Sequence, residues 1–166
     1  MSSAASELDR LFDQATIDFV VRSLVRLGAP DAELDDLAQD VMVIALTKQQ
    51  AFDTERALFP WLWGIARNRL RDYRDLARHR REVVTDTTVD TRGAADGDRL
   101  VGKALQTALA SLAEDMQLLV VLHDLEAWTL AESAAALSLS LDTAKYRLQL
   151  ARKSLRAQIA PNGSVS

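Results

Sequence analysis

Apolar residues recur along most of the chain at intervals of three and four positions, the spacing of helices that bury one face. The predicted helices cover residues 6–27, 31–49, 60–81, 99–112, 115–126, 129–138 and 141–159. Only 5% of residues are aromatic and only three are proline, whereas alanine and leucine are frequent, and this composition favours helix over strand. The chain is therefore predicted to be all-α.

Residues that commonly begin helices stand before several of these segments. Asp31 is the expected cap of the second helix, and Pro60 lies where a first-turn proline would open the long third helix. Thr129 and Glu132 have the spacing of a capping box, and Ser140 is a suitable cap for the last helix.

Residues 82–98 (EVVTDTTVDTRGAADGD) interrupt the helical pattern. They contain five acids against one arginine, and they lack both a helical period and bulky apolar residues other than valine. We therefore expect a flexible acidic linker between two small helical domains, at 1–81 and 99–160, followed by a tail at 161–166.

Charge is unevenly distributed although the formal net charge is only −4. Residues 67–81 hold seven arginines against two aspartates, whereas residues 1–40 are rich in acids. This segregation predicts a basic surface for nucleic acid and a separate acidic surface for a basic protein.

The acidic surface is predicted on the second helix. There Leu37, Val41 and Ile44 share one face, and a second face carries Asp36, Gln39, Asp40 and Val43. The acidic face could dock on a basic helix of a partner, or it could simply be solvated beside the core.

The basic surface follows a run of aromatic residues at 52–63. Aromatic rings stack on unpaired bases for roughly 1–3 kcal/mol each, and arginines neutralise the phosphates of the same strand. The Trp-Leu-x-x-Ile pattern at residues 61–65 is more often that of a helix core than of a base platform, so Trp61 and Leu62 are expected to be at least partly buried.

Residues 129–153 have the pattern of a helix-turn-helix, with alanines at the helix contacts and polar residues at the start of the second helix. Leu141, Ala144, Leu148 and Ala151 are expected to pack inward. Residues 140–158 carry five basic residues against Asp142, so the second helix could enter a DNA major groove.

Several functional classes find no support. The chain has no cysteine, its two histidines lie in different segments, and no catalytic triad, metal-ligand spacing or glycine-rich phosphate loop stands out. We expect no enzyme activity, cofactor or metal site. No apolar run approaches the roughly 20 residues that span a bilayer, and the first residues lack signal-peptide features, so a cytoplasmic protein without membrane insertion is expected.

Three motifs together resemble the extracytoplasmic-function (ECF, group IV) sigma factors of bacterial RNA polymerase. Residues 35–40 (DDLAQD) look like the acidic motif of sigma region 2.2, and residues 59–68 (FPWLWGIARN) look like regions 2.3 and 2.4. Residues 137–148 (LSLSLDTAKYRL) are similar to region 4.2, but Ser138 and Asp142 stand where the family has glycines, and Leu150 stands where arginine is common. The resemblance implies a sigma region 2 domain followed by a region 4 domain.

The resemblance also assigns roles to individual residues. The contacts to the β′ clamp helices of core RNA polymerase would come from Asp35, Asp36, Gln39 and Asp40. The contacts to the melted −10 element would come from Phe52, Asp53, Phe59, Trp63, Arg67, Asn68, Arg71 and Arg74. The contacts to the −35 element would come from Asp142, Thr143, Lys145, Tyr146, Arg147, Gln149 and Arg152.

Further partners are implied in the same way: promoter DNA, the β flap of the polymerase, and an anti-sigma factor that holds the protein inactive. The alternative is a stand-alone helix-turn-helix regulator, which would bind a palindromic site as a dimer and have no affinity for core polymerase. A binding decoy for an anti-sigma factor is a further alternative.

Overall fold

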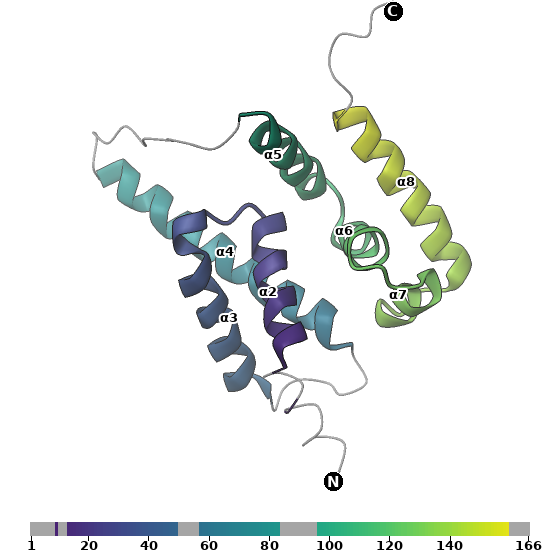
Figure 1. Cartoon of the computed structure of the whole chain (residues 1–166), viewed down its shortest axis with the longest axis horizontal. Coiled ribbons are helices and arrows are strands. Elements are labelled where there is room, and N and C mark those ends of the chain that lie inside the picture. Colours follow the sequence, from purple (N-terminus) through teal and green to yellow (C-terminus); the bar gives the residue numbers. More distant parts are fainter. Residues whose placement is uncertain (1–8, 10–12, 50–56, 84–95, 160–166) are drawn as a thin grey trace, which may run out of the picture. The chain divides into compact units, whose positions relative to one another are not determined.

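The computed structural model describes residues 9, 13–49, 57–83 and 96–159, and it divides the chain into two compact units, Met1–Gly93 and Ala94–Ser166 (Figure 1). The first unit contains α2 (Gln14–Arg26), the 3-10 turn η1 (Asp31–Glu33), α3 (Leu34–Thr47) and α4 (Leu58–Val83). The second contains α5 (Asp96–Ala110), α6 (Glu114–Leu119), the π-helical turn η3 (Val120–Leu125), α7 (Leu130–Ala136) and α8 (Leu141–Ile159). All regular elements of the described residues are helical, which confirms the predicted all-α class.

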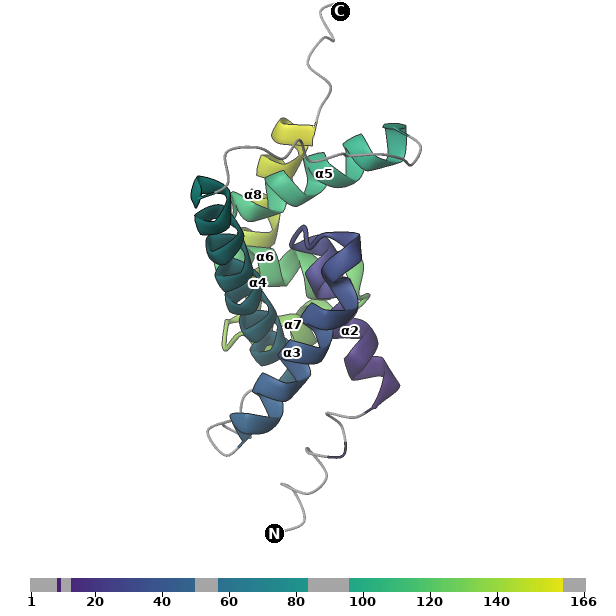
Figure 2. The same ribbon diagram turned by 90° about the vertical axis from the view of Figure 1, so that its left-hand side faces the viewer.

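The first unit is a bundle in which α2, α3 and α4 each contact the other two. Its centre is filled by fully buried side chains from all three helices, including Phe19, Leu37 and Leu62. Leu70 of α4 is buried, whereas no residue from 71 to 81 is buried. The arginine-rich end of α4 therefore extends beyond the core (Figures 1 and 2).

The second unit is organised around α8, which contacts α5, α6, α7 and η3. Ala134 of α7 and Ala144 and Ala151 of α8 are buried in its core. These small side chains let the two helices of the helix-turn-helix approach closely, as the alanine pattern predicted.

Most predicted helix starts agree with the structure, and one is wrong. Thr129 and Glu132 form the complete capping box, and Ser140 Oγ accepts a hydrogen bond from the Thr143 amide at 3.2 Å. Asp31 does not cap the second helix: it begins η1, and α3 starts after Glu33 without a side-chain cap. The 3-10 turn was not expected from the sequence, because acidic residues such as Asp31 and Glu33 are also common in the first turn of an α-helix.

Both units end a helix in the same way. Gly28 (φ 91°) follows α2 and Ser138 (φ 55°) follows α7, and both lie in the left-handed region. In each case the amide of the next residue donates to a carbonyl five residues back, Ala29 to Leu24 at 2.9 Å and Leu139 to Ala134 at 2.8 Å. These bonds satisfy carbonyls that the helix itself leaves without partners.

Candidate functional site

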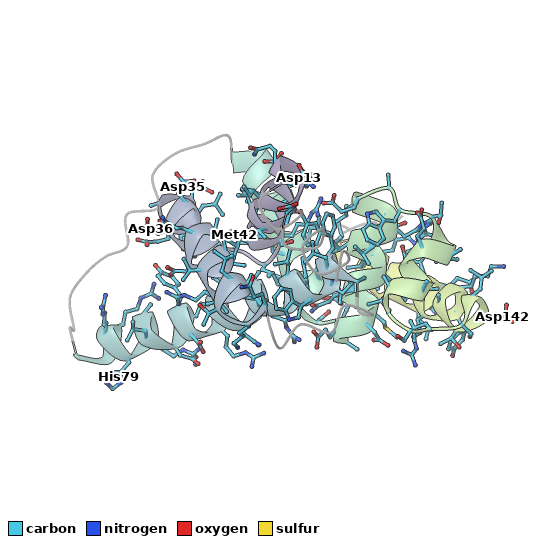
Figure 3. All side chains as sticks on the ribbon, turned by 90° about the horizontal axis from the view of Figure 1, so that it is seen from below. Asp13, Asp35, Asp36, Met42, His79 and Asp142 are labelled. Atoms are coloured by element: carbon cyan, nitrogen blue, oxygen red, sulfur yellow. The ribbon has the colours of Figure 1, made fainter. Side chains whose placement is uncertain are left out.

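The acidic side of α3 is exposed. Asp35, Asp36 and Gln39 all lie at the surface, and Figure 3 shows the two aspartates projecting from the start of the helix. Val43 is 55% exposed one turn further along the same side. Because an exposed valine beside acids has no role in this unit's core, Val43 extends the candidate contact surface that the resemblance assigned only to polar residues.

Asp40 has a structural role that the sequence did not reveal. Its Oδ2 accepts hydrogen bonds from Arg69 Nε at 3.0 Å and Arg69 Nη2 at 2.7 Å. The pair joins α3 to α4, and its two side chains are 45% and 28% exposed. Asp40 is thus held by Arg69 rather than directed outward like Asp36.

Two of the aromatic residues predicted to contact the −10 element are packed within the first unit. The Phe59 ring stacks on Phe19 with centroids 4.2 Å apart and planes 15° apart. Trp63 is only 1% exposed, so its ring offers no surface to a base in this structure. The alternative of a core role therefore describes both residues better. Phe52 and Asp53 lie outside the described residues.

The polar residues of α4 that were predicted to contact DNA differ in exposure and in hydrogen-bond partners. Asn68 and Arg71 are exposed, and Arg67 is half-buried. Arg74 is exposed as well, but its Nη2 donates to the Leu27 carbonyl at 2.7 Å. Because the last carbonyls of a helix lack intrahelical partners, Arg74 closes the end of α2 in addition to any contact with DNA.

A surface cavity of about 350 Å³ lies beside this bond. Its lining residues are Gly28, Pro30, Tyr73, Arg74, Ala77, Arg78 and Arg81. Three arginines around one hollow make a site that attracts phosphate groups. Sequence reasoning missed Arg78 and Arg81 as candidates, although the density of arginine in residues 67–81 was a signal for them.

In the second unit, two arginines predicted to meet the −35 element instead bind acids of neighbouring helices. Arg147 Nη1 is bonded to Asp115 of α6, and Arg152 Nε donates to Asp124 Oδ2 of η3 at 3.0 Å. The hydrogen bond that Arg152 donates to Asp124 raises the pKa of the Arg152 guanidinium, while burial acts in the opposite direction. Both side chains hold α8 against the rest of its unit.

Four of the five remaining predicted residues of α8 lie on its outer side. Asp142, Lys145, Tyr146 and Gln149 are exposed, and Figure 3 shows Asp142 at the outer end of this unit. Thr143 is half-buried, and its Oγ1 accepts a hydrogen bond from Ser140 at 2.8 Å. Thr143 is therefore bound into the start of the helix.

Two general features bear on function. Within the described ranges, no group of three or more His, Cys, Asp or Glu side chains is placed to hold a metal ion. The same part of the chain contains no helix that is both long enough and apolar enough to cross a membrane.

Known proteins share both units. A family model described as sigma-70 region 2 matches residues 14–82, and one described as sigma-70, region 4 matches residues 102–155. The ECF RNA polymerase sigma factor SigF of Caulobacter vibrioides is 30% identical over 128 residues, which cover 77% of this chain and 71% of SigF. The chain belongs to the ECF sigma factors. This membership confirms the resemblance seen in the motifs.

Other ECF sigma factors are similar over most of their length. SigL of Mycobacterium tuberculosis is 30% identical over 151 residues, which cover 86% of this chain and 83% of SigL. The sigma-E factor of Escherichia coli is 23% identical over 156 residues, with 85% and 81% covered. A chain in the solved complex of CnrH with the cytosolic domain of CnrY has the same fold, with a TM-score of 0.56, 24% identity and 97% of each chain covered.

Proposed function

We propose that this ECF sigma factor uses three separate surfaces to start transcription at its promoters. The acidic side of α3 binds the clamp helices of core RNA polymerase, α4 holds the −10 element, and α8 enters the major groove of the −35 element. The protein itself carries out no bond chemistry, which the polymerase supplies.

The observation that carries the proposal is the opposite charge of two exposed surfaces in the first unit. Asp35, Asp36 and Gln39 lie at the surface of α3, whereas Asn68, Arg71 and Arg78 lie at the surface of α4. A basic helix of a protein partner and the phosphates of DNA can therefore bind the same unit without competing for one surface. The stand-alone regulator does not account for an acidic surface of this kind.

The −10 contacts proposed for α4 are limited to its exposed and half-buried polar residues. Asn68 and Arg71 lie outermost, Arg67 lies beside them, and Arg74 and Arg78 line the adjoining cavity. Arginines in this position neutralise phosphates, and Asn68 has an amide that can bond to a base. Phe59 and Trp63 support this surface from the core side of the helix.

Run-off transcription with purified bacterial core polymerase and a pool of promoter fragments tests the proposal. Addition of this protein is expected to yield new transcripts, which Asp36→Arg should abolish together with co-elution of the protein with the polymerase. Asp18→Arg is the matched control, because Asp18 is an exposed acid of α2 outside the proposed surface. Absence of both transcripts and co-elution with the unaltered protein would favour the stand-alone regulator.

An anti-sigma factor is proposed as the controlling partner. The support is family membership together with the solved complex of CnrH, in which a protein of the same fold is bound by the cytosolic domain of CnrY. Inhibition of the run-off transcripts by a purified candidate, with formation of a one-to-one complex, would identify it. A candidate that forms the complex but leaves the transcripts unchanged would not have this role.

A further inference from the structure

The outer side of α8 carries an apolar pair that the fold does not use. Tyr146 is 63% exposed and Leu150 is 38% exposed. The two residues are four positions apart, so they are neighbours on the helix surface. The inward side of the same helix is already packed, with Ala144, Leu148 and Ala151 in the core.

The two arginines that flank this pair along the chain have other partners. Arg147 is bonded to Asp115, and Arg152 is bonded to Asp124 through two of its nitrogens. The middle of the outer side is therefore formed by Lys145, Tyr146, Gln149 and Leu150, all exposed. It contains no arginine, the residue that most often binds guanine in the major groove.

The base edges of the major groove offer one apolar group to such a surface, the 5-methyl group of thymine. Four residues of helix span about 6 Å, and base pairs are about 3.4 Å apart, so the pair extends over roughly two base-pair steps. Gln149, beside the pair, has the amide that bonds bidentately to adenine. Lysine side chains at 145 and 153 are exposed on the same side and can reach phosphates.

We propose that Tyr146 and Leu150 read thymine methyl groups in the −35 element, so that this sigma factor selects A·T pairs there rather than guanines. The inference rests on the proposed function, because it assigns the base class that α8 recognises. Methyl readout gives a role to the exposed apolar side chains at the centre of the outer side of α8, a surface that is otherwise polar and is proposed to bind DNA.

The test replaces thymine by deoxyuridine, which removes only the methyl group. The −35 element is located by mapping the start of a run-off transcript, and each strand of the element is synthesised with deoxyuridine in turn. Transcription by the reconstituted holoenzyme is expected to fall roughly fourfold for each methyl group read, the effect of losing one buried methyl contact. Deoxyuridine placed in the spacer is expected to have no effect.

Variants then connect the effect to the two residues. Leu150→Ala and Tyr146→Ala should lower transcription from the thymine template and lose most of the discrimination against deoxyuridine. Leu125→Ala is the matched control, because Leu125 is 39% exposed, close to the 38% of Leu150, but lies on η3. Thermal unfolding of each variant should match the unaltered protein, since all three side chains are at the surface.

The outcomes separate the two proposals. Equal transcription from thymine and deoxyuridine templates by an active holoenzyme would overturn the methyl readout and leave the proposed function intact. Undiminished discrimination by both alanine variants would overturn the assignment to this pair. If no template gave transcripts that depend on the protein, the proposed function would fail and the readout would fail with it.

Discussion

Helices α4 and α8 are the basic helices of their units, and each uses two arginines to hold its own fold. In α4 these are Arg69 and Arg74, which bind an acid of α3 and the last turn of α2. In α8 they are Arg147 and Arg152, which bind acids of α6 and η3. A count of basic residues therefore overstates the charge that either helix offers to DNA.

The two helices differ in what remains on the outside. The end of α4 beyond Leu70 has no buried residue up to Arg81, and it exposes five arginines together with Asp72, Asp75, Leu76 and His79. The middle of α8 instead presents Tyr146, Leu150 and polar side chains. Arginines suit phosphates, which carry no sequence information, while a mixed surface suits base edges. The comparison predicts that α4 contributes salt-sensitive affinity and that α8 contributes sequence selection.

The largest expected effect comes from reversing the charge at Arg71. Arg71 is exposed on the side of α4 that is proposed to bind phosphates, so Arg71→Glu should reduce run-off transcription at least about tenfold and lower the salt dependence of promoter binding by about one unit of slope. Association with core polymerase should persist, because the acidic side of α3 is unchanged. Filter binding over a salt series and co-elution with core polymerase provide the two measurements.

Lys103→Glu is the matched charge reversal for this experiment, since Lys103 is an exposed cation of α5. It should leave both the transcript yield and the salt dependence close to those of the unaltered protein. An equal loss from the two variants would mean that net charge, rather than the α4 surface, controls binding.

The ends of α2 and α7 offer a second comparison between the two units. Gly28 and Ser138 occupy the same left-handed position after α2 and α7. A left-handed backbone costs a residue with a Cβ about 1–2 kcal/mol. Gly28→Ala should therefore destabilise the first unit by about that amount, and Ser138→Gly should stabilise the second by roughly 0.5–1 kcal/mol after the entropy of glycine is subtracted.

Hydrogen exchange followed by mass spectrometry distinguishes these effects, because it reports on each unit separately. The unit without the substitution provides the internal control in each case. A destabilised second unit in Ser138→Gly would show that the serine side chain contributes more than its backbone conformation costs.

Local features of the fold could be predicted from the sequence, and contacts between distant residues could not. The bounds of α8 and the capping box at Thr129 depend on residues within a few positions, and both agree with the structure. Arg69 and Arg147 bind acids 29 and 32 positions away. No spacing rule distinguishes such an arginine from one that faces DNA, which is why Arg147 was assigned to the −35 element.

Burial limited the prediction of the −10 surface in a similar way. An aromatic residue at a helical spacing is compatible with both a core and a base platform, and only packing decides between them. Trp63 is in the core, with an indole nitrogen that has no hydrogen-bond partner among the described residues. The helical spacing of the surrounding residues indicated a core, but the resemblance assigned Trp63 to the −10 element, and no local feature decided between the two.

Double-mutant cycles can measure how much the ion pairs between helices contribute to the stability of each unit. We expect a coupling free energy of about 0.5–1 kcal/mol for Arg69 with Asp40, and a similar value for Arg147 with Asp115. The side chains of both pairs are between 28% and 45% exposed, so solvent screens them and the several kcal/mol of a fully buried pair is not expected. Urea unfolding of the single and double alanine variants gives the coupling.

A coupling near zero for Arg147 with Asp115 would return Arg147 to the candidates for contact with the −35 element. A coupling near zero for Arg69 with Asp40 would mean that this pair does not stabilise the packing of α3 on α4. Asp75 with Arg78 offers a comparison pair, because both side chains are at least 60% exposed and their closest atoms are 3.5 Å apart. Its coupling should be smaller than those of the two pairs between helices.

The smallest effect concerns the start of α7. The Thr129 amide donates to Glu132 at 2.8 Å, and this hydrogen bond lowers the pKa of the Glu132 carboxyl below its ordinary value of 4.5. Because the folded pKa is the lower one, ionised Glu132 favours folding above that ordinary value, and the contribution is lost as pH falls through the folded pKa. Glu132→Gln should therefore show a flatter dependence of the melting temperature on acidification than the unaltered protein. The two curves should converge at acidic pH, where both side chains are neutral. Parallel curves would show instead that the Glu132 carboxylate does not stabilise the start of α7.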